Sequence, residues 1–170
     1  PAILTQFPCL APDDWSLPTG EFPGATTPEA YKSRLQALAA EHTDPDTPFI
    51  TWGYHPLWHG EVWRDDLNQW FGDQPVMIWH RSFHEIIGND AAWAMLGVTA
   101  EDAALTPEAN WERGHFYEGG LKAVVAKLRF LFEPARFGKG MQNFLTMMHQ
   151  SGVTTALDMG TGLFCNPVQK

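Results

Sequence analysis

Apolar residues recur at helical spacing in several parts of the chain and predict helices there. The first helix begins at Pro28, with Thr27 suited to cap it, and ends before the proline-rich residues 43–48. A second helix follows Asn89, which suits the same capping position, and Gly97 suits its C-terminal end. Further helical segments are predicted over residues 65–70, 121–132 and 141–150.

Three short runs rich in apolar and β-branched residues predict strands over residues 49–54, 75–80 and 153–159. Because helices separate them, we expect parallel β-α-β units. Three strands are too few for a closed eight-stranded barrel, which typically needs about 250 residues. The predicted fold class is α/β: a partial (β/α) barrel segment or an inserted α/β domain, loop-rich and with few parallel strands.

The chain has 170 residues, of which 44% are hydrophobic, enough to form one core. We therefore predict a single domain over residues 1–170. Residues 1–27 are rich in Pro, Gly, Asp and Thr and predict a loop-rich lead-in, while residues 28–170 form the α/β body.

The charge balance narrows the range of partners. Eleven basic and 20 acidic residues give a net charge of −9, which repels phosphate groups, so we expect neither nucleic acid nor a membrane surface as partner. No run approaches the roughly 20 apolar residues of a membrane span, and no signal peptide is evident. We expect a soluble chain, cytoplasmic rather than secreted.

Histidines form the first group of candidate site residues. His80, Arg81 and His84 follow a predicted strand, and residues at the carboxyl ends of parallel strands line the sites of α/β proteins. A cationic and aromatic pocket mouth suits a carbonyl or carboxylate substrate, so these three residues are candidates for substrate binding. His55 and His59 share the four-residue spacing of paired zinc ligands, but Pro56 argues against a helix across them, and backbone hydrogen bonding is the simpler interpretation.

Acidic residues form the second group. Glu118 lies between aromatic residues and a glycine pair just before a predicted helix. It is a candidate metal ligand or general acid/base, and the structural alternative is a carboxylate that stabilises the helix N-terminus. Asp158 ends the third predicted strand and is open to either a site role or a structural one.

Three segments together resemble amidohydrolase family 3, the YtcJ-like metal-dependent hydrolases. Residues 75–98 (PVMIWHRSFHEIIGNDAAWAMLGV) are similar to its strand, histidine, asparagine and helix signature. Residues 114–118 (GHFYE) resemble its glycine-to-glutamate segment, and residues 152–158 (GVTTALD) resemble the entry to its next barrel strand. The resemblance implies a TIM-barrel enzyme that uses divalent metal, usually zinc, to hydrolyse C–N bonds such as those of amides.

The resemblance also implies an internal fragment. The family's H-x-H metal motif is missing, the later ligand-bearing strands would follow residue 170, and the chain begins with Pro1. Two site residues carry over: Glu118 as a metal ligand and His84 as a residue facing substrate. We expect pocket wall and lid rather than a complete site, so that the chain alone holds no metal and is inactive.

The competing hypothesis is a stand-alone small-molecule-binding or regulatory domain derived from the same fold. Some relatives carry regulatory labels, among them exoenzyme regulation, and clustered tryptophans would then bind a small molecule or partner. Strand edges and apolar surface left by missing neighbours also predict a homo-oligomer.

Overall fold

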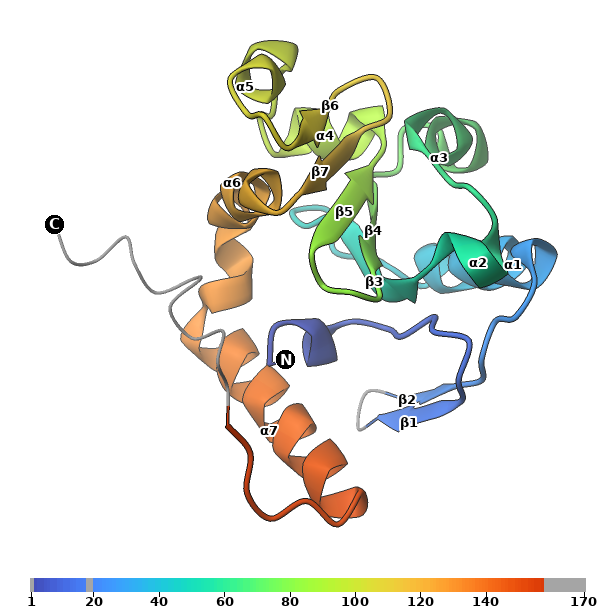
Figure 1. Ribbon diagram of the computed structural model, residues 1–170, viewed down its shortest axis with the longest axis vertical. Helices are drawn as coiled ribbons and strands as arrows, with labels where there is room; N and C mark the ends of the chain where they lie inside the picture. The colour runs from blue at the N-terminus through green and yellow to red at the C-terminus, as the bar shows by residue number, and fades with distance from the viewer. Residues whose placement is uncertain (1, 18–19, 158–170) are drawn as a thin grey trace, which may run out of the picture.

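The structure is a computed structural model that describes residues 2–17 and 20–157, and its centre is an open five-stranded sheet (Figure 1). The strand order is β3-β4-β5-β7-β6. Only β3 and β4 are parallel, and every other neighbouring pair is antiparallel. The strands are β3 (Phe49–Tyr54), β4 (Val76–His80), β5 (Glu85–Gly88), β6 (Ala109–Asn110) and β7 (His115–Tyr117).

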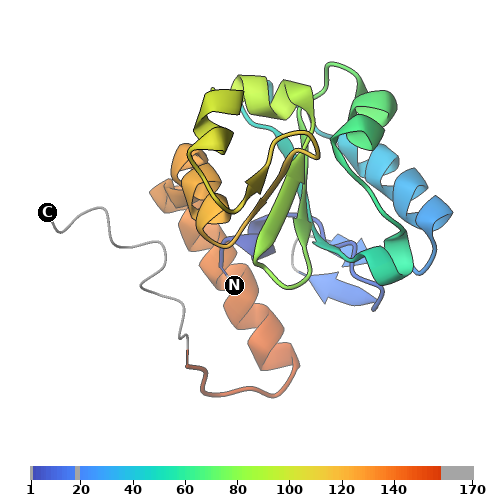
Figure 2. The same ribbon diagram turned by 45° about the horizontal axis from the view of Figure 1, so that its top comes forward.

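Helices cover both faces of this sheet. They are α1 (Pro28–Ala40), α2 (Pro56–His59), α3 (Arg64–Phe71), α4 (Asp90–Met95), α5 (Ala100–Ala104), α6 (Gly119–Lys127) and α7 (Pro134–Gln150), with short 3-10 helices η1 (Leu4–Gln6) and η2 (Arg129–Phe132). Figure 2 shows α1, in blue, on one side of the sheet and α6 and α7, in orange, on the other. No helix in the described ranges is long and apolar enough to cross a membrane.

The alternation of side chains along each strand produces two cores. Met77, Trp79 and Ile86 point to the face packed by the N-terminal segment, α4 and α6. Ile78 and Ile87 point to the opposite face, where they join apolar residues of α1 and α3. The central strands are therefore buried on both faces, as their nearly continuous apolar sequence indicates.

The predicted helices are confirmed, with shifts at their ends. The Thr27 hydroxyl accepts the Ala30 N–H at 3.2 Å, and Asn89 Oδ1 accepts the Ala92 N–H at 3.0 Å, so both predicted caps form. The turn expected over residues 65–70 is the full helix α3, and α7 begins seven residues before its predicted start at Met141. The segment expected as one helix over 121–132 is divided into α6 and η2.

The predicted strands β3 and β4 are confirmed as a parallel pair, and so is the α/β class with few parallel strands. The third predicted strand is wrong over residues 153–157, which have no regular structure and are exposed. Asp158 and residue 159 lie outside the described residues. The structure instead completes the sheet with β5, β6 and β7, which are two to four residues long and too short to show a period.

The lead-in is more ordered than its composition predicts. Beyond η1 it contains a β-ribbon of β1 (Trp15–Leu17) and β2 (Gly20–Phe22). The Leu10 N–H donates to the Trp52 carbonyl at 2.7 Å, and the Trp52 N–H donates to the Pro8 carbonyl at 3.1 Å, so residues 8–10 run along the edge of β3. Burying Leu4 and Leu10 offsets the entropy of ordering this segment, which is otherwise made of turns and irregular backbone between its short elements.

Candidate functional site

The strand topology brings the candidate residues to one edge of the sheet. Because β3 and β4 are parallel, Tyr54 and His80 end their strands side by side. The chain then turns back, so Glu85 begins β5 at the same edge, and antiparallel β7 ends there at Tyr117 opposite Glu85. Glu118 follows Tyr117 directly. Residues from three separate segments therefore gather at the end of β4.

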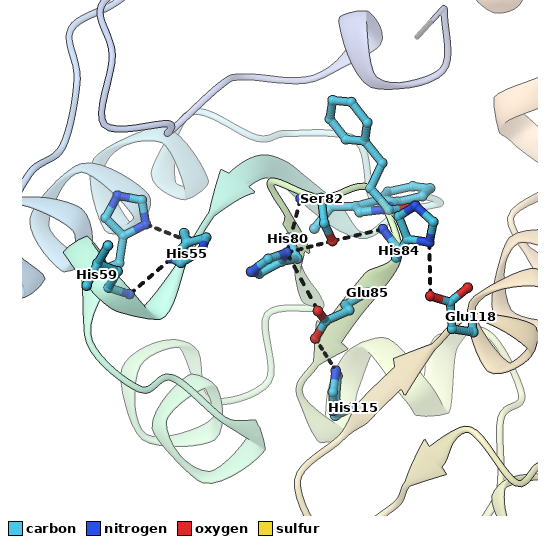
Figure 3. Close-up of polar contacts among 11 residues, drawn as sticks. His55, His59, His80, Ser82, His84, Glu85, His115 and Glu118 are labelled. Carbon is cyan, nitrogen blue, oxygen red and sulfur yellow. Dashed lines mark hydrogen bonds and ion pairs between the residues drawn. The ribbon is translucent and has the colours of Figure 1, made fainter. Parts of the chain in front are cut away.

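His84 and Glu118 form a pair at this edge, as Figure 3 shows. Their Nδ1 and Oε1 atoms lie 3.0 Å apart, and the Glu118 N–H donates to the His84 carbonyl at 2.9 Å. The two side chains are 60% and 62% exposed. With its Nδ1–H donated to the carboxylate, the neutral ring presents an unprotonated Nε2, the arrangement that carboxylates impose on reactive and metal-binding histidines.

Backbone strain is concentrated around this pair. In the described part of the chain, Phe83 (φ 69°) and Glu118 (φ 46°) are the non-glycine residues with positive φ. Phe83 precedes His84, and Glu118 contacts it through both backbone and side chain. Such conformations persist only where the surrounding structure holds them, and they cluster at functional sites. The strain marks the His84–Glu118 pair as the strongest candidate site of the sheet edge.

His80 lies in a second, more buried group beside this pair. Its Nδ1 accepts the Ser82 backbone N–H at 3.0 Å and contacts the Ser82 hydroxyl at 2.8 Å, so the proton of the neutral ring is on Nε2. The nearest oxygen of Glu85 is 3.7 Å from the same Nδ1, and the other oxygen of Glu85 accepts the His115 Nε2–H at 2.8 Å (Figure 3). Ser82 and Glu85 thus approach one nitrogen of His80, whereas a nucleophile triad places them on opposite nitrogens.

The electrostatic environment keeps His80 neutral. Burial lowers the pKa of His80, the charges of His55 and His115 lower it further, and the Glu85 carboxylate raises it in opposition. A neutral imidazole at this position can donate one hydrogen bond from Nε2 without adding positive charge to the edge.

The side chain of Arg81 contacts the lead-in segment. Its guanidinium binds the Asp13 carboxylate at 2.8 Å and lies 5.7 Å from the centre of the Trp58 ring. These contacts tie the end of β4 to the lead-in segment. Its predicted contact with substrate stays a prediction.

The His55 and His59 side chains are structural. His55 caps the single turn α2 by accepting the Leu57 N–H at 3.1 Å. His59 is buried, donates from Nε2 to the Ala25 carbonyl at 2.7 Å and accepts the His55 N–H on Nδ1 at 3.1 Å. Both ring nitrogens of His59 are therefore used, which confirms the interpretation as backbone-bonded histidines.

This arrangement predicts acid sensitivity. Burial lowers the pKa of His59 to about 4, against roughly 6.5 in the unfolded chain. As pH falls from about 6.5 to 4, the unfolded chain takes up a proton that the folded chain does not, so the free energy of unfolding should drop by about 2–3 kcal/mol. Urea unfolding at pH 7 and pH 4 measures it, and H59Q should show a smaller drop. An equal drop in both chains would contradict this role.

The donor set fits part of a metal site. No cluster of three or more His, Cys, Asp or Glu side chains that could hold a metal ion occurs within residues 2–17 and 20–157. His84 and Glu118 supply one imidazole and one carboxylate, both suitable zinc donors, whereas zinc sites use three or four protein ligands. Any metal here would need further ligands from outside the described residues.

The aromatic cluster of the binding-domain hypothesis is divided by the fold. Trp52 and Trp79 lie in the core, whereas Trp58, Trp63 and Trp70 are partly exposed. Trp63 contacts the His115 ring at 5.5 Å between centroids, and the Arg113 guanidinium covers its ring at 4.6 Å. Trp52 and Trp79 are therefore not available to a ligand at the surface, whereas the other three tryptophans are partly exposed.

Sequence reasoning missed Ser82, Glu85 and His115. Glu85 and His115 are 30 residues apart and meet only because β5 pairs with β7. The alternation of His115, Phe116 and Tyr117 was the available signal, since Phe116 is buried and its neighbours point to the other face.

Comparison with protein-family models and with curated proteins finds no match. Comparison with solved structures finds an uncharacterized metal-dependent hydrolase from Pyrococcus horikoshii OT3, with a TM-score of 0.58 and 17% sequence identity over 89% of this chain and 27% of that one. A second, from Pyrococcus furiosus, has a TM-score of 0.53 and 14% identity over 89% of this chain and 28% of that one. This chain shares the fold of part of a metal-dependent hydrolase. It spans little more than a quarter of the hydrolases it matches.

Proposed function

We propose that this chain is one segment of a longer metal-dependent amidohydrolase acting on C–N bonds, in which it forms part of the wall and lid of the substrate pocket. The likeness to two hydrolases along 89% of the chain supports this proposal, as does the resemblance of three segments to amidohydrolase family 3. The partial coverage of those hydrolases, 27% and 28%, is consistent with a chain that lacks the remaining metal ligands.

The contact between His84 and Glu118 carries the proposal. The two residues belong to different motifs of the family resemblance, 34 positions apart, and the fold places their side chains 3.0 Å from each other. Two residues that match separate motifs of a family have no reason to lie in contact in an unrelated fold. The positive φ of Glu118, and of Phe83 just before His84, indicates that the fold holds this contact at some cost in stability.

Each residue then has a defined task. Glu118 would hold the metal through Oε2, which has no hydrogen bond among the described residues, while its Oε1 orients the His84 ring. The metal, when bound, supplies polarisation of the amide carbonyl and a lowered pKa for its bound water. His84 would use Nε2 to bind the substrate or to accept a proton during the reaction. Neutral His80 would donate a hydrogen bond beside it.

We expect different activities from the 170-residue chain and from the longer protein. With zinc supplied, the longer protein should hydrolyse a small formamide or amide, and the 170-residue chain alone should not, because two donors do not complete a zinc site. Amide hydrolysis assays together with zinc analysis of both proteins test this. Turnover by the segment alone, or a longer protein that is active without bound metal, would contradict the proposal.

A further inference from the structure

Phe83 combines three features at the tip between β4 and β5. The residue is 44% exposed, its φ is 69°, and it immediately precedes His84. Its ring lies 5.6 Å from the Trp52 ring, at an interplanar angle of 54°. Phe83 is therefore an aromatic residue held partly in solvent beside the candidate site.

The backbone conformation of Phe83 is more favourable for other residue types. Glycine adopts a positive φ without steric cost and asparagine does so often, whereas a bulky aromatic residue there is an outlier. Two hydrogen bonds hold the conformation: the Phe83 N–H donates to the His80 carbonyl at 3.0 Å, and the Trp79 indole donates to the Phe83 carbonyl at 3.2 Å. The turn itself does not require an aromatic side chain.

Packing against the core does not explain an aromatic residue at position 83 either. The ring packs at a tilted angle against Trp52, which is buried and therefore a rigid support, while nearly half of the residue remains in water. Covering such a fixed, partly exposed ring with another apolar group is favourable, because it removes apolar surface from water without first ordering the ring.

We propose that Phe83 forms an apolar subsite that binds the aromatic substituent of an amide whose C–N bond lies at His84 and Glu118. This inference rests on the proposed function and adds a substrate class to it: aryl or arylalkyl amides in preference to small aliphatic ones. Aromatic rings attract each other in tilted or offset arrangements at centroid distances of 4.5–7 Å, which an exposed, supported ring can offer to a ligand.

The test measures binding of benzamide and acetamide to the 170-residue chain by NMR, following the indole N–H signals of its eight tryptophans. Benzamide should shift the Trp52 and Trp79 signals, and acetamide should bind at least about fivefold more weakly. F83N, which suits the positive φ, should lose this preference without a lower melting temperature, and F83Y should retain it. F137A removes a comparably exposed ring from α7 and serves as the control that keeps the preference.

Three results would overturn the inference: no benzamide-induced shifts near the tip, an unchanged preference in F83N, or a loss of preference in F137A. A lower melting temperature in F83N together with unchanged binding would assign Phe83 to packing instead. None of these results bears on the metal role of Glu118, because zinc content and hydrolysis by the longer protein test that role separately.

Discussion

Replacing Glu118 with Gln in the longer protein is expected to lower kcat/KM for a small amide by at least about 100-fold, with a parallel loss of bound metal. Glutamine retains the size of the side chain and can still accept the hydrogen bond from His84 at Oε1. It removes the negative charge that a divalent cation requires of a carboxylate ligand. Steady-state kinetics and metal analysis of the purified variant measure both effects.

A matched variant separates the metal role from a general loss of charge. Glu112 is an exposed glutamate in the turn before β7, so E112Q changes the net charge by the same amount in the same part of the fold. It should retain the activity and metal content of the parent. If E118Q and E112Q behave alike, Glu118 has no special role and the site assignment fails.

The Asn89→Ala variant is expected to reduce the free energy of unfolding by about 3 kcal/mol. Asn89 is fully buried, and its Oδ1 accepts the N–H groups of Ala92 and Val76, each at 3.0 Å. Its Nδ2 donates to the Gln74 carbonyl at 2.8 Å. Alanine leaves these backbone groups without their partner at the start of both α4 and β4. Urea unfolding of the variant measures the loss.

Thr99→Ala is the control for Asn89. Thr99 is an exposed cap of α5 whose hydroxyl accepts the Asp102 N–H at 3.2 Å, so alanine should cost only about 1 kcal/mol. Equal losses in the two variants would show that Asn89 acts as an ordinary cap and does not join α4 to the strand that ends at His80.

The features that the sequence predicted correctly are local. Thr27 and Asn89 cap helices through hydrogen bonds that reach only three residues along the chain, so their types and positions are readable in the sequence. The strands β3 and β4 are mostly apolar and almost entirely buried, so composition alone identifies them. The position of His80 at the end of β4 follows from the same local pattern.

The missed features depend on contacts between distant residues. The turn between β4 and β5 has Phe83 at φ 69°, where a glycine or asparagine would have signalled a turn. Without that turn, β5 could not be predicted, and neither could its pairing with β7, which brings Glu85 to His115. The lead-in shows the same limit, because Leu10 is ordered by its contacts with β3 rather than by any pattern of its own.

Both the local sequence pattern and the resemblance to amidohydrolase family 3 pointed to His84 and Glu118, and the structure places their side chains in contact. The sequence predicted neither the hydrogen bonds of His80 nor the contact of Arg81 with Asp13, since both depend on the residues that the fold places around these side chains. The contact between the two residues is a finding of the structure, and their role in a site stays a prediction.

The decisive experiment for the metal role of Glu118 is a crystal structure of the longer protein with zinc, in which anomalous scattering locates the metal. A zinc peak is expected at bonding distance, about 2.0–2.2 Å, from a carboxylate oxygen of Glu118, with the His84 ring beside it. A fully liganded zinc ion beyond contact with both His84 and Glu118 would contradict it.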